Sequence, residues 1–471
     1  MQDIKQILLK FKVKLIDKSL SGHCHLTHTC EEDLRVINQQ NGITLSSCPN
    51  EFKKEFYEEY SSDEELLSVD FFLCTHASSM CELFMPFGKP IIVVASTRYE
   101  IGRHGVSEWR EWNDYLALIM LKSKWGSEEV KRRSAVKGHT HIHSGGANVV
   151  AANNRYDQEY MQYFTGLDGI QLLPSICETF SEDSVRVHYA PTRQEILIAP
   201  SRDVNTFIAN EIIAVASGKD PSSNSILSSF MKLAGYSTNS EESSSGDHSS
   251  PTHAHGSKKL PSYTVKHIRQ LYPHFQYTDL AAHPAVVLLP YQVSFMLFFE
   301  LYSMNIPMFV PSPSLLTEWH LQHSILKERT WDSVFGHPNT HSPLPRHPHS
   351  TATSSLDPNN EFDREAILEW VSLADFYQFP HVTQFNNVSE FASVVASTDL
   401  SAISAMMEEF NYDRTERVSE QWSGVLSGVQ AHKQAYKLEH GSSELPSDIN
   451  TALAREYGVM LNEGCRGHHS V

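Results

Sequence analysis

The stretch at residues 283–312, HPAVVLLPYQVSFMLFFELYSMNIPMFVPS, decides the fold. Two continuously apolar runs, 285–289 and 307–311, flank a longer apolar stretch at 294–304. Short uninterrupted apolar runs are typical of parallel strands covered on both faces, and the longer stretch has the length of a helix. The pattern therefore predicts a strand–helix–strand unit with a single carboxylate, Glu300, inside its helix. An acid in this place needs a partner or a ligand, because an unpaired buried charge is costly.

The same design occurs earlier, in LCTHASSMCELFMPFGKPIIVVAS at residues 73–96. In each stretch a strand end leads through a short loop to a serine, Ser78 or Ser294, near the start of the apolar helix. A tight turn and a second apolar strand follow. Two such units in the two halves of the chain predict an α/β fold with two Rossmann-like domains that face a cleft.

Alternating strands and helices run through most of the remaining chain, as parallel sheets require. The expected strands are 12–16, 69–74, 91–96, 147–152, 170–174, 195–200, 285–289 and 307–311. The expected helices are 31–40, 107–122, 155–165, 204–216, 294–304, 363–373 and 400–430.

The chain of 471 residues is too long for one ordinary core and suggests two domains of about 200 residues each. We assign residues 1–185 to an N-terminal domain, 186–430 to a C-terminal domain and 431–471 to a polar tail. Two segments of the second domain, 217–262 and 336–360, are rich in Ser, Pro, His and other polar residues. We expect both to be unstructured insertions, because they offer few apolar groups to offset the entropy of ordering.

Charge and hydropathy exclude several classes of protein. The formal charge of −18 argues against a nucleic-acid partner, because phosphate backbones select basic surfaces. No apolar run reaches the roughly 18 residues of a membrane helix, and the N-terminus lacks the uninterrupted apolar region of a signal peptide. We therefore expect a cytoplasmic protein, with the lumen of the secretory pathway as the alternative if a signal or anchor precedes the chain.

Polar side chains follow four of the expected strands, at the edge where parallel sheets bind ligands. They are Arg98, Glu100, Arg103 and His104 after 91–96, Asn153 and Asn154 after 147–152, Ser201 and Arg202 after 195–200, and Tyr291, Gln292 and Ser294 after 285–289. Free N–H groups at helix starts favour a phosphate at this edge. An arginine such as Arg202 can clamp a diphosphate with two hydrogen bonds.

His23 and His25 follow the first expected strand, at the same edge of the first sheet. A histidine in this position can act as a general base toward an acceptor hydroxyl, because its pKa lies near the working pH. Cys24 lies between them, but the spacing matches no standard zinc pattern, and we expect no metal. The sequence also lacks a Walker loop, G-x-G-x-x-G, H-E-x-x-H, G-x-S-x-G and D-x-D. A metal-independent transferase remains compatible with these absences.

Several stretches together resemble GT-B glycosyltransferases of the family 4/1-like type. Residues 148–177 look like the end of their first domain, and EILIAPSRD at 195–203 resembles the first strand of their second domain. Residues 286–312 resemble their donor-binding unit, in which a glutamate on the helix contacts the donor ribose, and Glu300 matches this glutamate by position. Residues 399–422 resemble their long C-terminal helix, which crosses back over both domains.

The resemblance implies transfer of a sugar from a nucleotide-sugar, which is a co-substrate and not a cofactor, to a hydroxyl of a glycan, lipid or protein. Donor binding would fall to six residues: Ser201, Arg202, Tyr291, Gln292, Ser294 and Glu300. The candidates for catalysis are His23, His25, Glu100 and His104, and those for the acceptor side of the cleft are Arg98, Arg103, Asn153 and Asn154.

The chain departs from this family at several points. The Gly-rich loop usual near the start of the second domain is missing, and no lysine closely follows Arg202. The acid that many retaining members carry upstream of the ribose glutamate is absent, since Tyr291, Gln292 and Val293 stand there. The donor sugar and the stereochemistry therefore stay open. A non-catalytic protein that binds carbohydrate or nucleotide, and a sugar-nucleotide epimerase, are the alternative functions.

Overall fold

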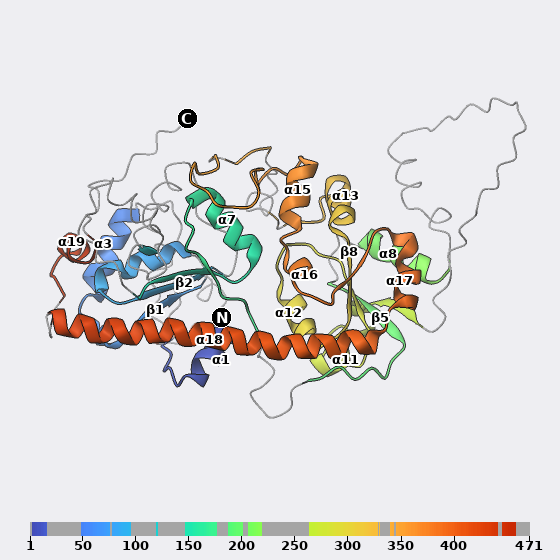
Figure 1. Ribbon diagram of the computed structural model, residues 1–471, viewed down its shortest axis with the longest axis horizontal. Coiled ribbons are helices and arrows are strands. Elements are labelled where there is room, and N and C mark those ends of the chain that lie inside the picture. The colour runs from blue at the N-terminus through green and yellow to red at the C-terminus, as the bar shows by residue number, and fades with distance from the viewer. Residues whose placement is uncertain are drawn as a thin grey trace, which may run out of the picture. The chain divides into compact units, whose positions relative to one another are not determined.

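The structure is a computed structural model that describes residues 2–16, 49–75, 78–95, 119–120, 147–176, 187–200, 206–218, 263–327, 329, 340–342, 345–440 and 445–457. The chain divides into two compact units, each assembled from separate stretches. Unit 1 consists of Met1–Thr179, Thr330–Asp375 and Asp413–Val471, and unit 2 of Phe180–Arg329 and Phe376–Tyr412. Each unit is an α/β layer structure with its own parallel sheet (Figure 1).

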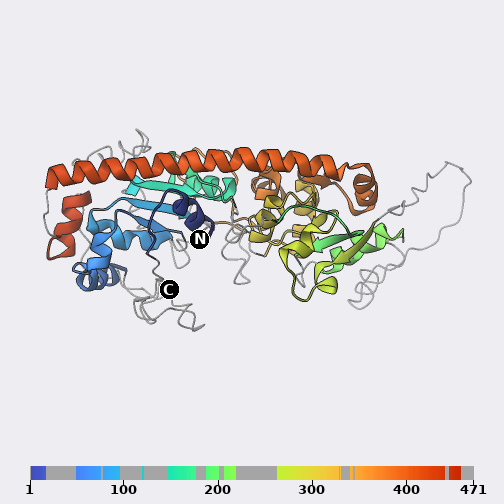
Figure 2. The same ribbon diagram turned by 90° about the horizontal axis from the view of Figure 1, so that it is seen from below.

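The sheet of unit 1 has four parallel strands, in the order β1 (Phe72–Cys74), β2 (Ile91–Ala95), β3 (Val149–Ala152) and β4 (Gln171–Leu172). β2 and β3 are buried along their whole length, as their uninterrupted apolar sequences predict. Alternate residues serve opposite faces of the sheet. Ile92 and Val94 join a core that includes Leu8 of α1 (Gln2–Lys10) and Trp422 of α18 (Leu400–His440), so both helices pack against this sheet, and α18 runs along it (Figure 2).

Three further helices pack together beside the sheet of unit 1. They are α3 (Pro49–Tyr60), the 3-10 helix η1 (Ser78–Phe87) and α19 (Ile449–Tyr457). The Asn148 side chain joins α19 to the sheet: its Oδ1 accepts from the backbone N–H of Ile91 at 2.8 Å, and its Nδ2 donates to the Tyr457 hydroxyl at 3.2 Å. A disulfide between Cys74 and Cys81 joins the end of β1 to η1.

The C-terminal residues correct one prediction from the sequence. We expected 431–471 to be a polar tail, yet α18 continues to His440, and α19 buries Leu453 and Tyr457 against unit 1. The sequence reads as polar because each helix presents only one narrow apolar face to the unit. Residues 330–375 and 413–430 also group with unit 1, although we assigned them to the second domain.

The described part of segment 336–360 is ordered, so the prediction of an unstructured insertion is wrong for these residues. Thr353 donates from its backbone N–H and its hydroxyl to the two carboxylate oxygens of Glu159, each at 2.7 Å. The hydroxyl of Tyr160 donates to Asn359 at 2.9 Å, and the indole N–H of Trp370 donates to the carbonyl of Leu356 at 2.9 Å. Side-chain hydrogen bonds to helices α7 (Arg155–Thr165) and α15 (Arg364–Val371) take the place of an apolar pattern here. The insertion 217–262 lies outside the described residues from position 219.

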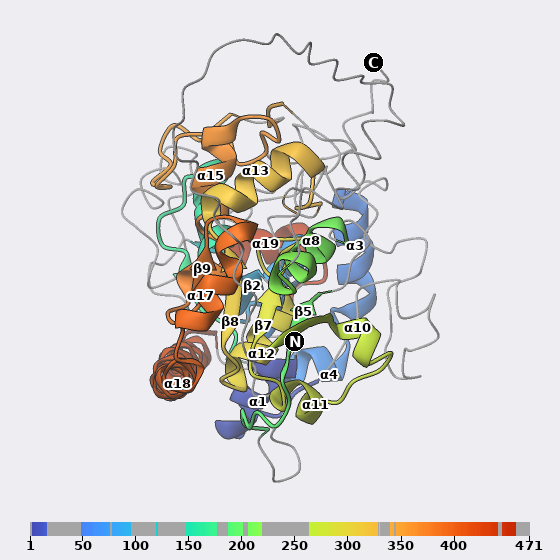
Figure 3. The same ribbon diagram turned by 90° about the vertical axis from the view of Figure 1, so that its right-hand side faces the viewer.

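The sheet of unit 2 has five parallel strands, in the order β6 (Thr264–His267), β5 (Glu195–Ala199), β7 (Val286–Leu288), β8 (Met308–Pro311) and β9 (Thr383–Phe385). Figure 3 views unit 2 from its end, with β9, β8, β7 and β5 following one another across it. Helices α8 (Thr206–Ala216), α10 (Ile268–Leu271), α11 (Tyr277–Ala281), α12 (Met296–Ser303), α13 (Pro313–His323), α16 (Asp375–Gln378) and α17 (Phe391–Ser397) complete the unit.

Most of the predicted elements are confirmed. The strand–helix–strand unit at 283–312 is β7, α12 and β8, and the one at 73–96 is β1, η1 and β2. The strand predicted at 12–16 is wrong, because residues 11–16 form a turn and irregular chain. The helix predicted at 31–40 lies outside the described residues, as does all of the one at 107–122 except two helical residues, 119–120.

Helix α18 contributes polar anchors to both units. In unit 2, the Asn411 side-chain amide donates to the carbonyl of Tyr302 and to Oδ1 of Asn305, each at 2.7 Å. In unit 1, Arg414 donates to the carbonyls of Ser175 at 2.9 Å and Ile176 at 3.3 Å. Within the described parts of the chain, none of the helices combines the length and apolar character that a membrane crossing requires.

Candidate functional site

The strand order of unit 2 creates a switch point between β5 and β7. From β5 the chain moves to β6 on one side, and it then returns to β7, β8 and β9 on the other side. In open parallel sheets a crevice forms at the carboxyl ends of the two strands where the order reverses, and ligands bind there. The backbone pairing of these strands reaches this edge, since the N–H of Leu289 donates to the carbonyl of Ala199 at 2.9 Å.

Tyr291, Gln292 and Ser294 lie at this edge, in the loop between β7 and α12, and all three are half-buried. The Gln292 side-chain amide donates to the Tyr291 hydroxyl at 3.0 Å. The Tyr291 ring packs against Phe295 with 5.6 Å between ring centroids, and Phe295 is buried. The loop is therefore held by an aromatic anchor, and its polar side chains stay partly exposed.

Glu300 lies in the second half of α12 and is half-buried. Burial raises the pKa of its carboxyl, and a hydrogen bond from the Tyr277 hydroxyl opposes this shift. Tyr277 is the first residue of α11. The acid inside the apolar helix thus has a protein partner, and a contact with a donor ribose stays a prediction.

His267 is a further polar residue of the same edge, and no strand-end pattern in the sequence indicates it. It ends β6, in register with Ile198 of β5, and is 5% exposed. Among the described residues neither ring nitrogen has a hydrogen-bond partner, and burial lowers the pKa of the imidazole, which favours its neutral form. Buried polar groups without partners are uncommon, which makes His267 a candidate for contact with a ligand. A possible signal was the alternation Thr264, Val265, Lys266, His267, in which only the second and fourth side chains are buried.

Asn153 and Asn154 follow β3 at the carboxyl edge of the unit 1 sheet. Asn154 caps α7: its Oδ1 accepts from the N–H of Asp157 at 2.7 Å, and its Nδ2 donates to the Asp157 carboxylate at 2.7 Å. The same amide donates to Oδ1 of Asn153 at 2.9 Å, and the backbone N–H of Asn153 donates to the carbonyl of Ala95 in β2. Asn154 is buried and its amide is fully used, so its observed role is to fix the start of α7.

The remaining predicted site residues lie outside the described part of the structure. They are His23, His25, Arg98, Glu100, Arg103, His104, Ser201 and Arg202. Among the described residues, no three His, Cys, Asp or Glu side chains gather in a way that suits a metal ion.

We found no match to this chain among protein-family models, curated proteins or solved structures. Fold and site together define an α/β protein with two parallel sheets, one of which has a switch point with half-buried polar groups at its carboxyl edge.

Proposed function

We propose that the protein is a glycosyltransferase of the GT-B type, in which unit 2 binds a nucleotide-sugar and unit 1 the acceptor. The observation that carries the proposal is the switch point of unit 2, where Tyr291, Gln292 and Ser294 lie half-buried at the carboxyl edge of five parallel strands. Open α/β sheets bind nucleotides at such points, because strand-end loops and the N–H groups of helix starts converge there. The resemblance of 286–312 to the GT-B donor unit supports the same assignment.

The proposed reaction needs a nucleophile, a base and a stabilised leaving group. The acceptor hydroxyl attacks the anomeric carbon of the sugar, the bond from this carbon to the diphosphate oxygen breaks, and the hydroxyl proton passes to a base. His23, His25, His104 and Glu100 are the candidates for the base. Helix N–H groups and Arg202 would hold the charge of the leaving diphosphate without a metal ion.

The test is a panel of UDP-, GDP- and CMP-sugars, followed for binding by calorimetry and for release of the nucleotide in the presence of glycan acceptors. Binding together with release that depends on the acceptor supports transfer. Binding without release favours a non-catalytic binding protein, and conversion of the bound sugar to its epimer favours an epimerase. A chain that binds no member of the panel contradicts the proposal.

Glu300→Gln tests the donor site. We expect it to weaken nucleotide binding by about 1–3 kcal/mol, the cost of losing a charged hydrogen bond, which is about 5- to 150-fold in Kd. Glu211→Gln is the matched control, because Glu211 is a half-buried carboxylate of α8 whose pKa burial also raises. Equal affinity of wild type and Glu300→Gln would make Glu300 a structural partner of Tyr277 alone.

A further inference from the structure

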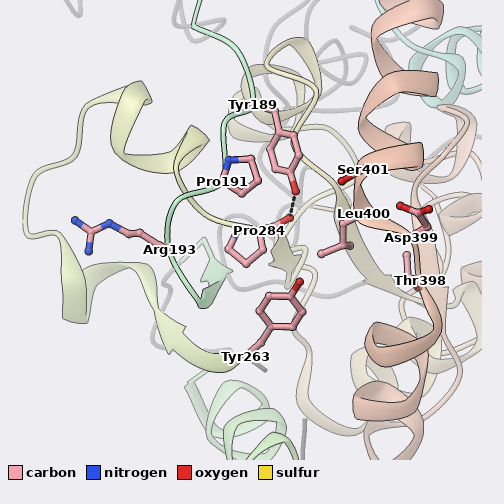
Figure 4. Close-up of a pocket in the computed structure, with 9 residues that line it drawn as sticks. All are labelled: Tyr189, Pro191, Arg193, Tyr263, Pro284, Thr398, Asp399, Leu400 and Ser401. Atoms are coloured by element: carbon pink, nitrogen blue, oxygen red, sulfur yellow. Dashed lines mark hydrogen bonds between the residues drawn. The ribbon is translucent and has the colours of Figure 1, made fainter. Parts of the chain in front are cut away.

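A concave site lies at the opposite, amino edge of the unit 2 sheet. Three stretches that precede strands meet there, 189–193 before β5, Tyr263 before β6 and Pro284 before β7, together with residues 398–401 at the start of α18. The pocket has a volume of about 370 Å³, near the lower end of the range of about 300–1,000 Å³ for small-ligand sites. Its lining consists of Tyr189, Pro191, Arg193, Tyr263, Pro284, Thr398, Asp399, Leu400 and Ser401 (Figure 4).

Rings form the middle of the pocket. Figure 4 shows Tyr189, Pro284 and Tyr263 in a column, with Leu400 beside them. The Tyr189 hydroxyl donates to the carbonyl of Pro284 at 2.9 Å, and this bond fixes the ring of Tyr189. Burial, with a smaller effect of Tyr263, raises the pKa of Tyr189 to about 12, so this tyrosine is a neutral group. Tyr263 is half-buried, and among the described residues its hydroxyl has no hydrogen-bond partner.

Polar groups of both signs flank these rings. Arg193 extends to one side, exposed, with its guanidinium 5.9 Å from the ring centroid of Tyr272, and it forms no ion pair with another described residue. Asp399 and Ser401 lie on the other side, at the start of α18. One oxygen of Asp399 accepts from the N–H of Ala402 at 3.0 Å, which leaves its other oxygen as an acceptor. The lining thus surrounds these rings with a surface that is more polar than apolar and that offers donors and acceptors.

We propose that this pocket binds a neutral sugar ring, such as a terminal hexopyranose of a glycan. A sugar ring has an apolar C–H face, which suits an aromatic floor, and hydroxyls around its edge, each of which donates and accepts. The lining carries one side chain of each charge, and the Arg193 guanidinium extends away from the rings, so the pocket suits hydroxyls better than a ligand of high net charge. The site lies at the other edge of the sheet from the switch point, so it recognises carbohydrate independently of any transfer.

The experiment uses the full chain and four probes, the methyl glycosides of mannose, glucose, galactose and N-acetylglucosamine. Saturation-transfer NMR should report binding of at least one glycoside by the wild type. Tyr263→Ala removes the stacking ring and should reduce the signal at least about tenfold, since stacking and its hydrogen bonds are worth about 1.4 kcal/mol or more together. Tyr263→Phe keeps the ring and should retain most of the signal.

Two controls separate the pocket from the rest of the molecule. Arg193→Gln changes an exposed side chain of the rim. It should weaken binding of the same glycoside without affecting folding. Tyr412→Ala removes an exposed tyrosine outside the pocket, 72% exposed, and should leave the signal unchanged.

Three results would overturn the proposal: no signal from any glycoside, equal signals from wild type and Tyr263→Ala, or displacement of the glycoside by UDP, which would place it at the switch point. Failure of the transfer reaction leaves these glycoside measurements unaffected, so the two proposals fail separately.

Discussion

A buried histidine lies at each edge of the unit 2 sheet, and the two histidines differ in their hydrogen bonds. At the amino edge, His283 is fully buried and both ring nitrogens are bonded: Nδ1 to the carbonyl of Glu195 at 2.6 Å and Nε2 to the hydroxyl of Tyr272 at 2.9 Å. A carbonyl only accepts, so Nδ1 carries the proton and Nε2 accepts from the tyrosine. At the carboxyl edge, His267 is 5% exposed, and neither nitrogen is bonded to another residue that the structure describes. Burial lowers the pKa of both imidazoles.

This difference separates groups that stabilise the fold from groups that cost stability. A satisfied buried imidazole contributes to stability, whereas an unsatisfied one carries the penalty of desolvation without compensation. Proteins tolerate such penalties mainly at functional sites. The contrast therefore agrees with the general rule that parallel sheets bind ligands at the carboxyl edge.

The largest effect is expected from a substitution that removes the hydrogen bonds of His283 at the amino edge. His283→Phe leaves the carbonyl of Glu195 and the hydroxyl of Tyr272 without partners, so we expect a loss of about 2–4 kcal/mol in the stability of unit 2. Hydrogen exchange of the β5 and β7 amides measures this loss locally. If the β5 and β7 amides of the variant exchange as slowly as in the wild type, the hydrogen bonds of His283 do not stabilise unit 2. The two histidines would then not differ in their effect on stability.

A smaller change at the same edge separates the contributions of the two hydrogen bonds of His283. Tyr272→Phe removes only the donor to Nε2 of His283 and keeps the bond from Nδ1 to the carbonyl, so we expect a loss of about 1 kcal/mol. Urea denaturation of the full chain, with Tyr412→Phe as the exposed control, measures the effect. A loss as large as that of His283→Phe would assign the whole contribution to the tyrosine.

The carboxyl edge should respond with the opposite sign. His267→Phe replaces an unsatisfied imidazole by an apolar ring, and we expect unit 2 to gain about 0.5–1 kcal/mol at pH 7. The urea midpoint of the variant against that of the wild type measures the gain. If the variant loses stability as His283→Phe does, the nitrogens of His267 have partners in solution, and the two edges do not differ.

The pH dependence gives the smallest expected effect. The pKa of His267 in the folded protein lies below its ordinary value of 6.5, so only the unfolded chain takes up a proton as the pH first falls below 6.5. The wild type therefore loses stability as the pH falls from 6.5 toward the lowered pKa. His267→Phe should lose less over this interval, which thermal melts at pH 7.5, 6.5 and 5.5 would show. Parallel pH profiles of the two proteins would contradict the assignment.

The sequence predicted the inner strands of the two sheets well, because burial on both faces leaves an uninterrupted apolar run. The runs at 91–96, 147–152, 195–200, 285–289 and 307–311 are strands, and the helix predicted at 155–165 has the bounds of α7. The strands β6 and β9 escaped prediction, since each has three or four residues with polar positions and no continuous apolar run. The ordered conformation of residues 340–342 and 345–360 was not predicted for a related reason. Its hydrogen bonds join residues far apart in sequence, such as Thr353 and Glu159.

The candidate site was predicted in part. The position of Tyr291, Gln292 and Ser294 at a strand end follows from local pattern alone, and the structure places them at the carboxyl edge of β7. His267 could not be selected, because its importance depends on burial and on missing partners, which no local pattern reveals. The partner of Glu300, Tyr277, lies on another helix, and no local pattern pairs the two residues.

By itself, the sequence determined the class of fold and the strand ends where polar residues gather, because apolar runs and helix periods are local consequences of burial. Only the tertiary structure decided the strand order β6-β5-β7-β8-β9, and with it the switch point between β5 and β7. It also decided which distant stretches meet, as at the pocket formed by Tyr189, Tyr263, Pro284 and Leu400. Contacts between distant stretches depend on how whole layers pack around a shared core. This packing is determined by residues far apart in sequence, and no short stretch of chain encodes it.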